Sequence, residues 1–130
     1  MRTMQLALDD ADLSAGDVDV VYASANATTV LDRAEACAIE RLFGDRPVVT
    51  SVKGALGEFG AAGTAACAAA FLCGRKGKVP PIAGLEAPIA EARGLRLARE
   101  AVDAPGPIAL VNSFASGGAL FTAALRVAME

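Results

Sequence analysis

Apolar residues at helical and at strand spacing alternate along the first half of this 130-residue chain. Residues 3–13 place apolar side chains three and four positions apart, which predicts an amphipathic helix. Residues 19–23 and 47–51 are short apolar runs beside turn-forming residues. We expect each of these two runs to be a buried strand.

A second helix is predicted between these strands, over residues 32–43. Asp32 is the expected N-cap, because Glu35 follows three positions later in a capping-box pattern. Gly44 is expected to end the helix, since glycine readily adopts the backbone conformation found just beyond a helix C-terminus.

The second half of the chain continues the alternation. Residues 90–101 predict a short helix, and residues 107–112 and 119–127 predict two strands. Alternating helices and strands indicate an α/β fold with a mainly parallel sheet, in which the closely connected last pair forms an antiparallel hairpin. A free-standing nucleotide-binding module is disfavoured, because no glycine-rich turn has dinucleotide-binding or Walker spacing after a strand.

Residues 61–73 form a helix-length segment with no charge, AAGTAACAAAFLC. A helix that is apolar or small on every side must be covered on every side. One small domain rarely provides that cover, although an ordinary buried helix is the alternative interpretation. We therefore expect a close interface with a partner or a second copy, involving Ala61, Ala62, Ala65 and Ala69.

Composition and charge narrow the choice of partner. The chain is 54% hydrophobic, and a domain of this size buries only about two-thirds of its unfolded surface when it folds. We therefore expect a partner surface to cover part of the remaining apolar surface. Its net charge of −3 argues against nucleic acid, and we interpret the basic residues 75–78 as a solvated loop rather than a phosphate contact. No apolar run is long enough to span a bilayer, so we expect no membrane association and a cytoplasmic location.

The cysteines do not predict a metal site. Cys37, Cys67 and Cys73 lack CxxC spacing, and the chain contains no histidine. We expect them to be small buried hydrophobic residues. No cofactor is predicted.

Three polar loops follow the predicted strands, and the ends of strands are where ligands collect in open α/β sheets. The first contains Ser24 and Asn26, the second contains Lys53 and leads into Gly-Ala-Ala-Gly at 60–63, and the third is Asn-Ser-Phe-Ala-Ser-Gly-Gly at 112–118.

In order and spacing, these loops resemble the C-terminal half of the β-ketoacyl-acyl-carrier-protein synthases, members of the thiolase-like superfamily. The similarity covers nearly the whole chain, residues 1–130, and includes Val-Pro-Pro at 79–81. It implies one half of a five-layer αβαβα sandwich, with residues 61–73 in the central layer. It also implies that the strand opening this half comes from another polypeptide. A split subunit and a fragment both fit that expectation.

The resemblance also assigns site positions. Phe114 matches the first aromatic residue of a loop that lines the family's acyl entrance, and Ser116 replaces the second. The candidate substrate-binding residues are Asn26, Asn112, Phe114, Ser116, Gly117 and Gly118. Each has a plainer interpretation: the asparagines as turn stabilisers, Phe114 as a packing residue and the glycine pair as a close backbone approach.

The departures from the family carry the functional hypothesis. Ser24 and Glu58 stand where family synthases have histidines, and the family's nucleophilic cysteine belongs to the half that this chain lacks. Two imidazoles donate hydrogen bonds to the thioester oxygen during condensation, whereas an ionised Glu58 would repel the developing enolate. Lys53 is retained, either as a remnant of the active site or as a structural partner of Glu58.

We therefore expect a non-catalytic subunit, similar to the chain-length factors, in polyketide or fatty-acid-type biosynthesis. The resemblance implies a thiolase-like N-terminal half or an active ketosynthase subunit as partner, with acyl carrier protein reached through the complex. The alternative is a divergent acyltransferase or decarboxylase, in which a partner supplies the cysteine and Ser24, Asn26 and Lys53 take part in the chemistry.

Overall fold

The computed structural model describes residues 1–115 and 117–128. The helices are α1 (Arg2–Asp10), α2 (Thr29–Phe43), α3 (Lys53–Leu56) and α4 (Ala62–Arg75), with short 3-10 helices at Ala15–Asp17 and Ala90–Ala92. The strands are β1 (Val20–Tyr22), β2 (Val48–Thr50), β3 (Lys78–Val79), β4 (Arg96–Leu97), β5 (Val102–Asp103), β6 (Ile108–Phe114) and β7 (Leu120–Arg126).

The main sheet has five strands in the order β4-β2-β1-β6-β7. Four of them are parallel, and β7 pairs antiparallel with β6. Strands β3 and β5 form a separate antiparallel pair. The predicted α/β class and the final hairpin are confirmed. All five strands of this sheet come from the chain itself, and a strand supplied by another polypeptide stays a prediction.

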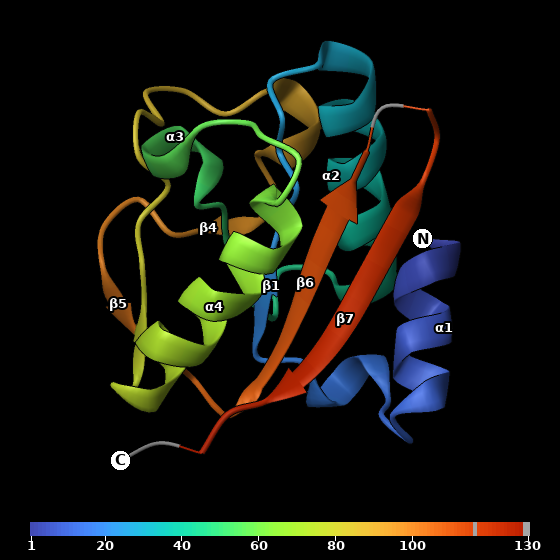
Figure 1. Ribbon diagram of the computed structural model, residues 1–130, viewed down its shortest axis with the longest axis vertical. Coiled ribbons are helices and arrows are strands. Elements are labelled where there is room, and N and C mark those ends of the chain that lie inside the picture. Colours follow the sequence, from blue (N-terminus) through green and yellow to red (C-terminus); the bar gives the residue numbers. More distant parts are fainter. Residues whose placement is uncertain (116, 129–130) are drawn as a thin grey trace.

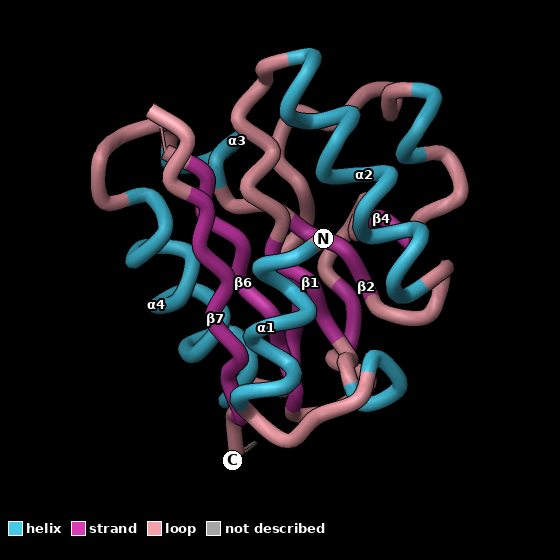
Figure 2. The backbone as a smooth tube through the Cα atoms, turned by 90° about the vertical axis from the view of Figure 1, so that its right-hand side faces the viewer, coloured by secondary structure: helices cyan, strands magenta, loops and turns pink. Residues whose placement is uncertain are grey.

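Helices cover both faces of the sheet, with α1 and α2 on one side and α4 on the other (Figures 1 and 2). Side chains alternate between the faces along a strand. Val21 therefore packs with Leu8 and Ile39 of the first two helices, whereas Val20 and Tyr22 pack with residues of α4. Strands β1 and β2 are buried on both faces, and all their residues except Thr50 are apolar.

The predicted helix over residues 90–101 is wrong. Only Ala90–Ala92 is helical, and Arg96–Leu97 forms β4 beside Val48 and Val49 of β2. Gly94 separates the two pieces, and a side chain there would meet the Glu40 carboxylate of α2. Pairing with β2 thus outweighs the weak helical pattern of this segment.

Helix α2 begins earlier than predicted. Its N-cap is Thr28, and Asp32 lies inside the first turn. Asp32 and Glu35 therefore do not form a capping box; both accept hydrogen bonds from the loop that follows β1. Gly44 ends the helix with a positive φ of 65°, as predicted.

Candidate functional site

The three polar loops meet at the carboxyl ends of β1, β2 and β6, at the upper edge of the sheet in Figure 1. This juxtaposition follows from the parallel pairing, which places the ends of neighbouring strands at one edge. Ser24 follows β1, Lys53 opens α3 after β2, and Phe114 is the last residue of β6.

Lys53 lies at the centre of this junction. Its Nζ donates to Ser24 Oγ at 3.0 Å and to Glu58 Oε2 at 2.5 Å. The lysine side chain is only 9% exposed, whereas that of Glu58 is 51% exposed. The predicted contact between Lys53 and Glu58 is confirmed, so a largely buried ammonium is neutralised by a carboxylate at the rim of the site.

Ser24 is buried and accepts a second hydrogen bond, from the Phe114 backbone N–H at 3.2 Å. Its hydroxyl oxygen thus links the lysine loop to the end of β6. Nothing in this arrangement activates the hydroxyl as a nucleophile, because the chain has no histidine and the neighbouring Lys53 ammonium is a hydrogen-bond donor.

The Glu35 carboxylate of α2 fixes the loop that follows β1. This carboxylate accepts from the Ser24 N–H at 2.8 Å, from the Ala25 N–H at 2.9 Å and from Asn112 Nδ2 at 2.9 Å. Burial raises the pKa of this carboxyl, and the three hydrogen bonds oppose that shift. A buried acid therefore fixes the position of the loop that carries Ser24.

The same loop has unusual backbone geometry. Ala25 and Ala27 have positive φ angles of 36° and 63°, a region that residues other than glycine rarely occupy. Asn26 lies between them; its side-chain oxygen accepts from the Thr28 N–H at 3.1 Å, and its own N–H donates to Asp32 at 3.0 Å. The turn-stabilising interpretation of Asn26 agrees with these contacts.

Asn112 lies inside β6 and is fully buried. Besides its bond to Glu35, it accepts from Thr122 Oγ1 of β7 at 2.8 Å and contacts Met4 Sδ at 3.5 Å. It therefore joins α2, the last two strands and α1, and it does not belong to a turn.

A cavity of about 420 Å³ opens beside the lysine junction. Asn26, Glu58 and Phe114 line it, together with Ala62 and Gly63 of α4. Phe114 is half-buried there. Ser116 lies outside the described residues. The cavity brings together three of the predicted site residues, whereas Asn112 lies behind them in the core.

Gly117 and Gly118 have positive φ angles of 93° and 85°. A Cβ at either position would meet no atom within 4 Å. The predicted close backbone approach is therefore wrong, and the glycines are explained by a conformation that other residues rarely adopt.

Helix α4 is covered on one side only. Ala62, Ala66 and Ala70 face the sheet and are buried, so Ala62 is already enclosed within the chain and is not available to a partner. We define the outer α4 face as the apolar residues that remain exposed or half-exposed on the other side of this helix and at its N-cap: Ala61, Ala65, Ala68, Phe71 and Leu72. Ala69, which was also predicted for the interface, is half-buried and packs against the core cluster between α4 and the sheet. Phe71 is 48% exposed and Leu72 is 60% exposed.

The cysteines are less buried than predicted. Cys37 is exposed on α2, and Cys67 and Cys73 are half-buried on α4. Burial raises the pKa of the Cys67 thiol, which disfavours the reactive thiolate. Among residues 1–115 and 117–128, no group of three or more potential ligands is placed to hold a metal ion.

Ser24 and Glu58 both contact the Lys53 Nζ, and their correspondence to the family's catalytic positions stays a prediction. The sequence predicts Glu35 as part of a capping box beside the loop after β1, but not the hydrogen bonds by which it holds that loop. The available signal was its place in the run Asp32-Arg33-Ala34-Glu35-Ala36 directly after that loop.

Residues 1–86 match the family described as "Beta-ketoacyl synthase, C-terminal domain", and the chain belongs to this family. Within the described residues, no helix has the length and apolar character needed to cross a membrane.

Two curated relatives show how the chain relates to longer proteins. It is 45% identical over 89 residues to the tetracenomycin polyketide synthase ketoacyl synthase beta subunit of Streptomyces glaucescens, covering 67% of this chain and 22% of the relative. It is 35% identical over 129 residues to 3-oxoacyl-[acyl-carrier-protein] synthase 2 of Rhizobium meliloti (strain 1021), covering 96% of this chain and 30% of the relative. The chain thus spans less than a third of the length of either relative.

The fold is also similar to a solved structure titled "The ishigamide ketosynthase/chain length factor". The TM-score is 0.87 at 29% sequence identity, and the match covers 96% of this chain and 32% of the other. The thiolase-like fold expected from the sequence is confirmed.

Proposed function

We propose that the chain is a non-catalytic, chain-length-factor-like part of a β-ketoacyl synthase complex in polyketide or fatty-acid-type biosynthesis. The observation that carries this proposal is the contact of Lys53 with Glu58 and Ser24, the two residues for which the resemblance to the family implies histidines in active synthases. This arrangement offers a carboxylate at the position where negative charge would develop during condensation.

The energetics favour a scaffold over a condensing enzyme. Loss of one oxyanion donor typically lowers the rate about 10²–10³-fold, and here both imidazoles are absent. The names of the relatives agree with this view, since one is a ketoacyl synthase beta subunit and one solved structure pairs a ketosynthase with a chain length factor.

A partner is proposed from the outer α4 face. Exposed Phe71 and Leu72 lie on a helix that has its opposite side packed against β6 and β1 residues. In the proposed complex, a thiolase-like N-terminal half or a ketosynthase subunit covers this face and completes a five-layer sandwich. Acyl carrier protein would then be engaged through the complex.

The divergent acyltransferase is the second candidate, and one observation favours it. Lys53 remains beside Ser24 next to a cavity large enough for an acyl group. In that mechanism, the partner supplies the nucleophilic cysteine and Lys53 stabilises negative charge.

Product formation by the complex purified from its own host, with Lys53→Ala or Ser24→Ala in this chain, separates the two candidates. A scaffold predicts rates within a few-fold of the wild type, because the chemistry occurs on another subunit. A divergent enzyme predicts a loss of about 10²-fold or more. Lys76→Ala, in the exposed loop after α4, is the control, and assembly of each complex is checked separately. A large loss in an intact complex would contradict the scaffold proposal.

A further inference from the structure

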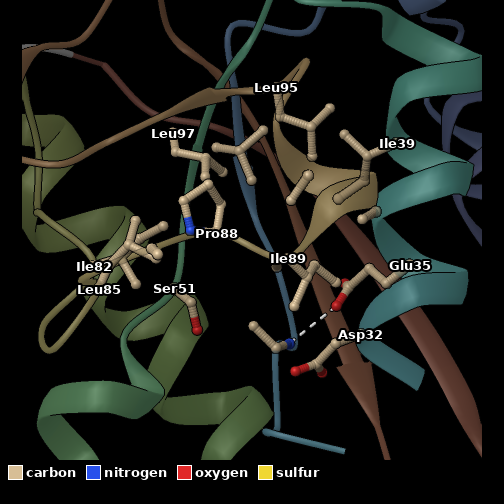
Figure 3. Close-up of a pocket in the computed structure, with 16 residues that line it drawn as sticks. Asp32, Glu35, Ile39, Ser51, Ile82, Leu85, Pro88, Ile89, Leu95 and Leu97 are labelled. Atoms are coloured by element: carbon tan, nitrogen blue, oxygen red, sulfur yellow. Dashed lines mark hydrogen bonds between the residues drawn. The ribbon is translucent and has the colours of Figure 1, made fainter. Parts of the chain in front are cut away.

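A second cavity lies on the opposite face of the sheet from α4, between α2, the loop that follows β1, strand β2 and the segment of residues 82–97, which includes β4 (Figure 3). Its volume is about 180 Å³. It is separate from the lysine junction, because neither Lys53 nor Glu58 lines it.

The walls of this cavity are almost entirely apolar. The sheet contributes Val49 and Leu97, and α2 contributes Ile39, which together form the buried floor. The segment over the sheet contributes four larger side chains, which are half-buried or exposed at the cavity: Ile82, Leu85, Pro88 and Ile89. Apolar surface that stays open to water in this way gains free energy when an apolar molecule covers it.

The segment over the cavity is held in place at both ends. The Ile82 N–H donates to the Ala98 carbonyl at 2.9 Å, and Arg33 of α2 pairs with Glu91 at 2.7 Å. Gly54 of α3 approaches the Ala83 carbonyl so closely that a Cβ at position 54 would clash with it. Because these contacts fix the backbone, we expect the cavity to persist without collapse of its wall.

One end of the cavity is polar. Figure 3 shows Ser51, Asp32 and Glu35 at this end, with the apolar side chains beyond them. Glu35 already accepts three hydrogen bonds. Ser51 is only 3% exposed, and among the described residues its hydroxyl oxygen accepts one long bond, from the Lys53 N–H at 3.4 Å. Asp32 uses one carboxylate oxygen for the Asn26 N–H.

We propose that this cavity binds a small neutral molecule with an apolar body and a single hydroxyl group, of the size of a phenol. Apolar cavities of about 150 Å³ accept benzene, so the volume is sufficient for one ring. The ring would lie against Ile39, Leu95 and Leu97. The hydroxyl would donate to Asp32 and accept from Ser51, which satisfies the polar end of the cavity.

The proposal is tested with 4-fluorophenol as the probe, by ¹⁹F NMR titration of the full chain. Saturable binding is expected. Ala92 lines the cavity, whereas Ala90 of the same 3-10 helix is exposed and does not line it. Ala92→Phe fills the space and should weaken binding at least 10-fold, and Ala90→Phe should stay within two-fold of the wild type.

Fluorobenzene, which lacks the hydroxyl, tests the polar end. The wild type should prefer 4-fluorophenol over fluorobenzene, and Ser51→Ala should reduce this preference. Circular dichroism of each variant verifies folding. No saturable binding to the wild type, equal weakening by Ala92→Phe and Ala90→Phe, or an unchanged preference in Ser51→Ala would each overturn the proposal. The titration does not depend on the partner, so its outcome is independent of the proposed scaffold function.

Discussion

At the scale of single residues, the candidate site depends on three charged side chains: the paired Lys53 and Glu58, and the buried Glu35. Lys53 is largely buried and is neutralised by Glu58, which reaches it from the rim. Glu35 is buried and receives three N–H donors, two of them from a loop with positive φ angles at Ala25 and Ala27. Lys53 and Glu58 form the ion pair of the site, and Glu35 fixes the backbone of the loop that carries Ser24.

The raised pKa of Glu35 makes its contribution to stability dependent on pH. The folded state holds the proton more tightly than the unfolded state. The contribution is therefore fully present below about pH 4.5, the ordinary value, and is lost as the pH rises through the raised pKa of the folded state. Glu35→Gln removes the titration and should flatten this dependence, at a cost of about 1–3 kcal/mol for the hydrogen bond from Ala25 that the amide cannot accept.

Urea denaturation between pH 4 and pH 8 measures this effect. Glu40→Gln is the matched control, because Glu40 is exposed on the same helix. The control should keep the wild-type pH dependence. If Glu35→Gln kept it as well, burial of the carboxyl would not be its cause.

At the scale of helices and strands, α4 packs very closely against β6. A Cβ added at Gly63 would lie 2.7 Å from the Ser113 Cβ, which real side chains do not tolerate. Gly63 therefore sets the distance between this helix and the strand that carries Asn112 and Phe114.

Gly63→Ala should lower the free energy of unfolding by about 1–3 kcal/mol, because it overpacks this contact. Thermal or urea unfolding measures the change. Adding Ser113→Gly removes the blocking atoms and should recover part of the loss. Gly60→Ala is the control, since a Cβ there meets nothing within 4 Å and Gly60 has no positive φ. Equal effects of the two alanine substitutions would contradict the close-packing explanation.

The elements that were predicted correctly are those in which local pattern and tertiary environment agree. Examples are β1 and β2, whose apolar runs are buried strands, and α4, whose uncharged run is a helix packed on the sheet. Strand β4 could not be predicted, because two residues carry no periodicity and are defined only by their pairing with β2. The function of Glu35 was missed for a similar reason, since it depends on Asn112, 77 residues away.

At the scale of the whole molecule, the two faces of the sheet are covered unequally. Helices α1 and α2 cover one face of the sheet, and α4 covers only part of the other (Figures 1 and 2). Phe121 of β7 is 65% exposed, in addition to Phe71 and Leu72 of the outer α4 face. Large exposed apolar side chains that gather in one patch mark protein interfaces.

Native mass spectrometry of the tagged chain, purified from its own host, tests the central claim most directly. We expect the wild type to be recovered with a chain that carries a thiolase-like N-terminal half or a ketosynthase subunit. Ala65→Glu, on the outer α4 face, should abolish this complex by placing an unpaired carboxylate in the interface, at a cost of several kcal/mol. Ala34→Glu, exposed on α2, should leave it intact. A wild type recovered without such a partner, or a complex that survives Ala65→Glu, would contradict the account.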